Sequence, residues 1–161
     1  MIPTDRFFDG KTKTIYEGKL YSRLYTVIDA PGKYCLSFEF ISTNSKYEQY
    51  IGLSMYCFKG AVKLNGEKVK LRKGVFSGMK FSEETAPKQF TVEMIVEEGE
   101  VNVFNGADGW IMDTIHNAEQ ATPAMIVEKN GENSYVFHCN DYVYDDDFDD
   151  LVFSLEVTKL E

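Results

Sequence analysis

Six aspartates fall within ten residues near the C-terminal end of the sequence, at positions 141–150. Carboxylates crowded in this way repel one another, which costs free energy unless they are solvated or share a cation. Ligand sets made only of oxygen suit calcium. The spacing therefore predicts a calcium site at Asp145, Asp147, Asp149 and Asp150. The alternative is a solvated acidic turn that keeps the edge of a sheet soluble.

The aspartate run partly matches the calcium-binding loop of an EF-hand. Asp145, Asp147 and Asp149 fall at positions 1, 3 and 5 of that loop, and Glu156 falls at position 12. Position 6, which needs a glycine for the sharp turn, is Asp150. The following residues alternate as a strand instead of starting a helix, so the sequence argues against an EF-hand.

Aromatic residues beside polar ones indicate a second kind of site, one for carbohydrate. A pyranose ring has an apolar face and a rim of hydroxyls, so it needs an exposed flat ring next to hydrogen-bonding side chains. Trp110 is the only tryptophan and follows a glycine-rich segment. The alternative is that Trp110 begins a strand and fills the core. The predicted ligand-binding residues are Trp110, Asn105, Asp108, Tyr142 and Tyr144, with Tyr47 and Tyr50 as further rings.

No catalytic arrangement is evident in the sequence. The two histidines, His116 and His138, are far apart and have no nearby HxH or HxxxH partner. The nucleophile elbow, the P-loop and the GxGxxG fingerprint are absent, and Ser77-Gly78 is typical of a turn. We therefore predict that the protein is not an enzyme.

The elements that position these residues are predicted to be strands. Period-two alternation recurs along the chain, aromatic residues make up 14% of it, and helix periodicity is not sustained. The clearest core strand follows the aspartates directly, with Leu151, Phe153, Leu155 and Val157 on one face. Further single strands are predicted over 20–28, 34–40 and 51–58.

Three two-residue turns predict hairpins, and each turn fixes which residues face each other across the strands. The predicted turns and pairs are Asn65-Gly66 with Val62 opposite Val69, Glu98-Gly99 with Val96 opposite Val101, and Asn130-Gly131 with Val127 opposite Ser134.

The length and net charge of the chain limit the possible number of domains and the possible partners. A chain of 161 residues is expected to form one domain, 1–161, and to bury roughly 70% of the surface that its unfolded form exposes. The net charge is −9 and would be −3 without the six aspartates of 141–150, so nucleic acid is not expected as a partner. Cys35, Cys57 and Cys139 fall in strand-like runs, and we expect half-buried thiols, with a Cys35–Cys57 disulfide as the alternative.

Membrane insertion is not expected either. The opening MIPTDRFFDG carries charges where a signal peptide needs an apolar core, and no window approaches the roughly 18 apolar residues of a membrane helix. We expect a cytoplasmic protein if Met1 is the native start, and an extracellular one if the chain is a module of a larger protein.

Nine or ten strands without crossover helices must pair mainly in antiparallel fashion. The predicted connections differ sharply in length, whereas an up-and-down barrel favours short, even ones. We therefore predict an all-β, antiparallel two-sheet β-sandwich of jelly-roll type. A lipocalin-like β-barrel is the alternative.

Two resemblances add to this prediction. The run YDDDFDDLVF resembles the Asp-x-Asp-Phe-Asn-Asp-Leu-Val segment before a C-terminal strand in some secreted bacterial β-sandwich domains of unknown function, with Asp149 in place of the asparagine. That resemblance implies a cation held by this loop. The strand pattern is similar to that of the galactose-binding-like jelly rolls of carbohydrate-binding modules, many of which carry a structural calcium ion.

Together these observations favour a non-catalytic ligand-binding module, with carbohydrate as the expected ligand and a structural calcium ion. The alternatives are a structural or assembly protein, such as a phage or cell-surface component, and a cytoplasmic β-barrel that binds an apolar small molecule. The sequence does not name the ligand or a protein partner.

Overall fold

The computed structural model describes residues 8–71, 76–108, 123–141 and 147–160, and these form an all-β structure. All strand pairs are antiparallel. No helix in the described part of the chain is long and apolar enough to span a membrane. The eleven strands are β1 (Lys13–Tyr16), β2 (Lys19–Ser22), β3 (Tyr25–Ile28), β4 (Gly32–Thr43), β5 (Glu48–Leu64), β6 (Glu67–Val69), β7 (Phe76–Ser82), β8 (Gln89–Asp108), β9 (Ala124–Lys129), β10 (Ser134–Asn140) and β11 (Leu151–Leu160).

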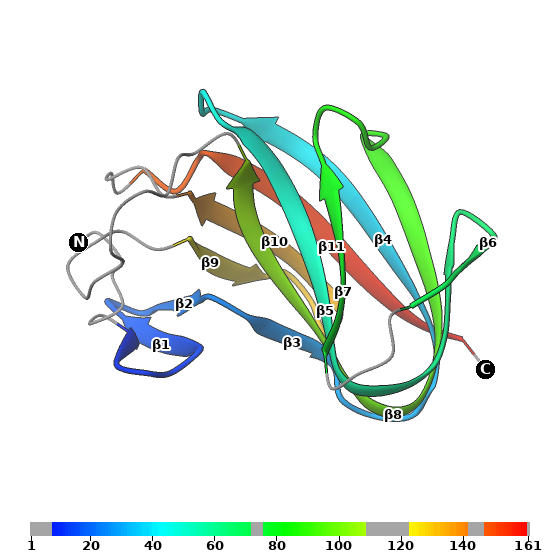
Figure 1. Ribbon diagram of the computed structural model, residues 1–161. Coiled ribbons are helices and arrows are strands. Elements are labelled where there is room, and N and C mark those ends of the chain that lie inside the picture. The colour runs from blue at the N-terminus through cyan, green and yellow to red at the C-terminus, as the bar shows by residue number, and fades with distance from the viewer. Residues whose placement is uncertain (1–7, 72–75, 109–122, 142–146, 161) are drawn as a thin grey trace.

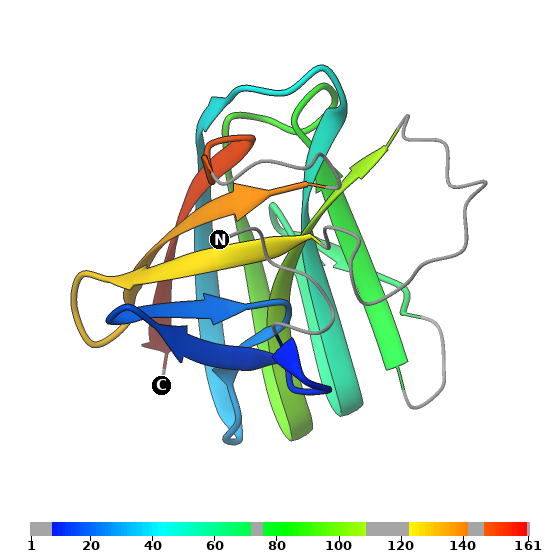
Figure 2. The ribbon, with the colours of Figure 1, turned by 90° about the vertical axis from the view of Figure 1, so that its left-hand side faces the viewer.

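The strands form one continuous sheet that folds over itself into two layers (Figure 1). Its order is β1-β2-β9-β10-β11-β4-β8-β5-β6, while β3 pairs with β8 and β7 pairs with β5. Figure 2 shows β1, β2, β9 and β10 side by side in the first layer. The second layer consists of β3, the C-terminal half of β8, the N-terminal half of β5, and β7. The predicted antiparallel β-sandwich is confirmed, although it has eleven strands where nine or ten were expected.

The lipocalin-like barrel is the wrong alternative because the sheet is not closed. Aromatic rings from both layers fill the space between them. Phe81 of β7 lies 4.5 Å from Phe90 of β8, and Phe90 lies 5.1 Å from Phe38 of β4, measured between ring centroids. Tyr25 of β3 packs edge-on against Phe137 of β10 at 5.9 Å. The interior is therefore a packed core, as the alternation predicts.

The long strands β5 and β8 bend together where the sheet passes from one layer to the other. Gly99 has a φ of 93°, and a Cβ atom there would lie only 2.6 Å from the carbonyl oxygen of Tyr56. The β5–β8 register shifts between Tyr56 and Gly60. The predicted turn at Glu98-Gly99 is therefore wrong, because β8 continues through it as a bulge. A hairpin and a bulge both switch the buried face from even to odd residues, so the pattern alone does not separate them.

The other turn predictions have mixed outcomes. The hairpin at Asn65-Gly66 is confirmed, with Val62 opposite Val69. The hairpin at Asn130-Gly131 is present, but its register is wrong: Val127 lies opposite Phe137. The reason is a longer loop, in which Asn130 N donates a hydrogen bond to Ser134 O at 2.9 Å.

Strand boundaries also differ in places. The predicted strand over 20–28 is two strands, β2 and β3, which belong to different layers. The preceding β1 was not predicted. The segment 76–82, expected as turn and loop, is β7, and residues 105–108, expected as loop, end β8.

The three cysteines are free thiols, so the alternative of a Cys35–Cys57 disulfide is wrong. Cys35 is half-buried, as expected. Cys139 is fully buried and Cys57 is exposed, contrary to the expectation for these two. Cys57 lies at the bend with a φ of 51°, which takes its side chain out of the alternation.

Candidate functional site

The outward face of β5, β7 and β8 in the second layer carries two aromatic residues that lie opposite glycines. In the register of β5 and β8, Tyr50 faces Gly106 and Gly52 faces Phe104. A Cβ atom on Gly52 would lie 2.2 Å from Phe104 Cζ, and one on Gly106 would lie 2.2 Å from Tyr50 Cζ. Each ring therefore lies over the backbone of the neighbouring strand, in space that only a glycine leaves open.

The two rings form a half-buried aromatic pair. Their centroids are 6.4 Å apart and the ring planes are nearly perpendicular, at 88°. Burial raises the pKa of the Tyr50 hydroxyl, and the nearby Asp108 carboxylate adds to this, while Lys80 acts in the opposite direction. The hydroxyl of Tyr50 is therefore protonated at neutral pH and can donate a hydrogen bond.

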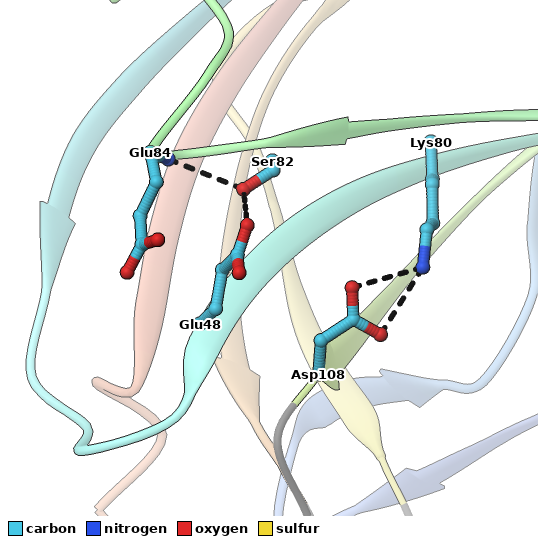
Figure 3. Close-up of polar contacts among 5 residues, drawn as sticks. All are labelled: Glu48, Lys80, Ser82, Glu84 and Asp108. Atoms are coloured by element: carbon cyan, nitrogen blue, oxygen red, sulfur yellow. Dashed lines mark hydrogen bonds and ion pairs between the residues drawn. The ribbon is translucent and has the colours of Figure 1, made fainter.

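An ion pair, shown in Figure 3, lies close to the Tyr50 ring. Lys80 Nζ of β7 contacts both carboxylate oxygens of Asp108, at 3.1 and 2.9 Å. The same ammonium group lies 4.7 Å from the centroid of the Tyr50 ring. The hydrogen bond to Asp108 raises the pKa of Lys80, so the ammonium group is charged at neutral pH. We name Tyr50, Phe104, Lys80 and Asp108 the outer platform.

Polar groups extend the outer platform along the end of β5. The Ser82 hydroxyl donates a hydrogen bond to Glu48, and the backbone N–H of Glu84 donates to Ser82 Oγ at 3.2 Å (Figure 3). The site thus combines flat apolar surface with carboxylate, hydroxyl and ammonium groups. These groups suit binding of a polar ligand with an apolar face.

The predicted ligand-binding residues fall in different places. Asp108 belongs to the outer platform. Asn105 comes from the same strand but points inward, is 4% exposed, and donates a hydrogen bond from Nδ2 to Asn140 O at 2.7 Å. Three further predicted residues lie outside the described residues: Trp110, Tyr142 and Tyr144.

The aspartates predicted to bind calcium do not share one environment. Asp147 is exposed, and Asp149 accepts a hydrogen bond from Asn44 Nδ2 at 2.9 Å. Asp150 is buried, and its Oδ2 accepts the backbone N–H of Asp141 at 2.9 Å. Asp145 lies outside the described residues. Within the described ranges, no group of three or more His, Cys, Asp or Glu side chains is arranged to hold a metal ion.

Phe148 anchors the described end of the acidic loop. It is buried, has a φ of 53°, and its N–H donates to Asn140 Oδ1 at 2.7 Å. Its ring packs edge-on against Tyr21 at 5.4 Å, in a small cluster with Phe8. A bulky residue rarely adopts a positive φ, so this packing and hydrogen bonding hold Phe148 against the outer side of the first layer.

A second polar cluster, which sequence reasoning missed, lies inside the sandwich at the same end of β5 and β8. Gln49 and Asp141 are both completely buried, and Gln49 Nε2 donates to Asp141 Oδ2 at 3.0 Å. Ser45 Oγ donates to the same oxygen at 2.6 Å. With Asn105, these residues form what we name the inner cluster. Gln49 and Asn105 continue the inward alternation of Ile51 and Val103. They were missed because the predicted strand began at residue 51 and residues 105–108 were expected as a loop.

Comparison with models of protein families, with curated proteins and with solved structures finds no match to this chain. The geometry of the site itself is therefore the basis for inferring the function.

Proposed function

We propose that this protein is a non-catalytic ligand-binding module, that its ligand is carbohydrate, and that the outer platform is the binding site. The observation that supports the proposal is the aromatic pair of Tyr50 and Phe104 beside the Lys80–Asp108 ion pair. The side chains of Lys80 and Asp108 are 53% and 45% exposed, so a ligand can reach them.

The chemistry of the outer platform fits a sugar better than a purely apolar ligand. The apolar face of a pyranose can pack on Tyr50 or Phe104, while its hydroxyls exchange hydrogen bonds with Asp108, Lys80 and the Tyr50 hydroxyl. Hydrogen bonds to charged groups contribute about 1.5–3 kcal/mol each, which suits a weak, reversible site. Asp108 is also the last residue of β8, two positions before Trp110 in the sequence.

Calcium is the second part of this proposal. The expected ligands are Asp145, Asp147, Asp149 and Asp150, and the ion would stabilise the loop that Phe148 anchors. Removal of calcium with a chelator should then lower Tm, and Asp147→Ala should abolish the part of the difference that the loop contributes. An unchanged Tm with and without the chelator would argue against a calcium ion in the loop.

Affinity gel electrophoresis against soluble glucans, xylans, mannans and galactans tests the sugar site, followed by calorimetry with the best ligand. Tyr50→Ala and Asp108→Ala should each weaken binding about tenfold or more, because each removes roughly 1.4 kcal/mol or more of contact. Tyr56→Ala is the matched control, since Tyr56 projects from the same face of β5 but lies opposite Glu100, away from the ion pair. Retention of wild-type affinity by both platform variants would overturn the proposed site.

One observation favours a second candidate function, assembly into a larger structure. Ile15 is 74% exposed and lies on β1, a strand at the end of the sheet order. An apolar residue on an unpaired strand edge is a common place for another chain to add. Sedimentation velocity over a wide concentration range tests this function: self-association that Ile15→Lys abolishes would support it, and a monomer at all concentrations would argue against it.

A further inference from the structure

Two amide oxygens in the inner cluster have no hydrogen-bond donor among the residues that the structure describes. They are Gln49 Oε1 and Asn105 Oδ1, on side chains that are 0% and 4% exposed. A buried acceptor without a partner is costly, and native proteins contain few of them. Two such acceptors in one cluster indicate that a bound group, which is not part of the polypeptide, interacts with them.

The orientation of both amides follows from their other contacts. Gln49 Nε2 donates to Asp141 Oδ2 and to Tyr47 O, at 3.0 and 3.2 Å. Asn105 Nδ2 donates to Asn140 O at 2.7 Å. If the nitrogen and oxygen of either amide were exchanged, the amide oxygen would face another hydrogen-bond acceptor. The two atoms without a donor are therefore the amide oxygens.

The two amides approach the same short segment of chain. Gln49 contacts Asp141, and Asn105 contacts the adjacent Asn140. Gln49 pairs with Ala107 across the strands, which places Asn105 at the diagonal position on the same inward face. The two amides and the carboxylate of Asp141 are thus buried neighbours at the same end of the sandwich.

We propose that Gln49 Oε1, Asn105 Oδ1 and the carboxylate of Asp141 bind a hard divalent cation, with calcium as the best fit. Amide and carboxylate oxygens are calcium ligands, and calcium tolerates irregular ligand geometry. A cation satisfies both orphan acceptors at once and offsets the charge of the buried carboxylate. The third unpartnered atom in the described residues, Asn102 Nδ2, is a donor and takes no part.

This site is separate from the sugar site and from the predicted ligands in the acidic loop. It uses the inward face of β5 and β8, whereas the outer platform uses the outward face. It needs neither Asp147 nor Asp149. Variants can therefore distinguish a cation in the inner cluster from one in the loop, and neither result depends on sugar binding.

Thermal unfolding of the full chain with calcium and with a chelator is the first test. Calcium at about 100 times its dissociation constant should raise Tm by about 5–10 °C. Gln49→Met keeps the volume but removes the oxygen, and it should remove the part of the shift that the inner cluster contributes. Asp147→Asn changes only the loop, so it should retain that part. The readout is the difference between the two conditions, so a change in baseline stability does not obscure it.

Magnesium at the same concentration is a parallel arm, and it should give a smaller shift because it demands stricter octahedral geometry. The proposal is overturned if calcium gives no shift in the wild-type protein. It is also overturned if Gln49→Met keeps the shift while Asp147→Asn loses it, because the ion would then belong to the loop.

A crystal structure of the wild-type protein grown with calcium is the second test, and it needs no variant to fold. Anomalous scattering at long wavelength should place a calcium ion about 2.3–2.6 Å from Gln49 Oε1 and Asn105 Oδ1. A water molecule there, at hydrogen-bond distance and without anomalous signal, would overturn the proposal.

Discussion

The two faces of one strand pair, the N-terminal half of β5 and the C-terminal half of β8, carry polar residues of opposite character. The outward face holds Tyr50 and Asp108, whose polar groups reach solvent or an exposed partner. The inward face holds Gln49 and Asn105, which are buried and contact Asp141 and the last residue of β10, respectively. Adjacent residues along the same strand therefore have different physical tasks.

The difference between the faces is one of solvation. Polar groups on the outer platform can exchange a protein partner for water at little cost, so they contribute little to stability and can change partners when a ligand arrives. Polar groups of the inner cluster have no water to replace a lost partner, so each broken contact costs the full desolvation penalty. The inner cluster should therefore determine stability, and the outer platform should determine binding.

The largest expected effect comes from the bend that both faces share. Gly99→Ala forces a Cβ atom to within 2.5 Å of Cys57 O at a φ of 93°. We expect a loss of about 3 kcal/mol in the free energy of unfolding, and loss of both sites together, because backbone must move. Urea denaturation measures the loss. Gly131→Ala is the control, since its nearest contact would be 3.8 Å, and comparable unfolding free energies for the two variants would contradict this account.

The second-largest expected effect distinguishes the inward face of β5 and β8 from the outward face. Asp141→Ala leaves the buried Gln49 amide and Ser45 hydroxyl without their shared acceptor, so we expect a loss of about 2–4 kcal/mol in the free energy of unfolding. Sugar affinity of the folded fraction should not change. Denaturation and calorimetry on the same preparation check both parts. A cost below about 0.5 kcal/mol would mean that the inner cluster does not support the fold.

The corresponding change on the outward face is Lys80→Met, and it should lower sugar affinity while leaving stability almost unchanged. Lys80→Met removes the ion pair with Asp108 and the contact with Tyr50, yet both ion-pair partners are about half exposed. We expect the free energy of unfolding to fall by less than about 1 kcal/mol, while sugar affinity falls several-fold. If stability falls as far as in Asp141→Ala, the contrast between the two faces is wrong.

The smallest effect concerns pH and Cys139, a buried residue of β10 close to Asp150. Burial, with a further contribution from the Asp150 carboxylate, raises the pKa of the Cys139 thiol well above the ordinary value of 9.0. The unfolded thiol ionises near pH 9 while the folded one stays protonated, so the unfolded state binds fewer protons there. This contribution to stability is present in full below pH 9 and is lost as pH rises toward the folded pKa.

At pH 9 the expected loss from Cys139 is about 0.4 kcal/mol, because half of the unfolded thiols are then ionised. Urea denaturation at pH 7, 8 and 9 measures it, with Cys139→Ala as the reference that cancels the titration of lysines and tyrosines. Parallel pH profiles for the two proteins would show that the thiol does not contribute. Exposed Cys57 should react with a thiol reagent in the native state, whereas Cys139 should react only after unfolding.

Features that a few neighbouring residues specify were predicted from the sequence more accurately than features that depend on distant residues. Alternation identified the core faces of β4 and β11, because burial of one face requires a period of two. The Asn65-Gly66 turn was also predictable, since two adjacent residues with positive φ define a tight hairpin. Gly99 was misassigned because a bulge and a turn use the same residue type and shift the alternation equally.

The candidate sites were less predictable than the fold. Asp108 was identified from its neighbours in sequence, but its partners Lys80, Tyr50 and Phe104 come from other positions along three strands. The aspartates were visible as a run, yet the fold turns Asp150 inward and leaves Asp147 exposed. Composition predicts that charges are crowded, but it does not predict which of them the chain will bury.

The sequence by itself determined the class of this protein, an antiparallel all-β sandwich, because alternation and turn chemistry act over a few residues. Only the tertiary structure decided which polar residues meet. The pairing of β5 with both β7 and β8 places Lys80 beside Asp108, and the return of the chain after β10 brings Asp141 to Gln49. These contacts join residues 28 and 92 positions apart, and such separations depend on strand order and register, which no local pattern specifies.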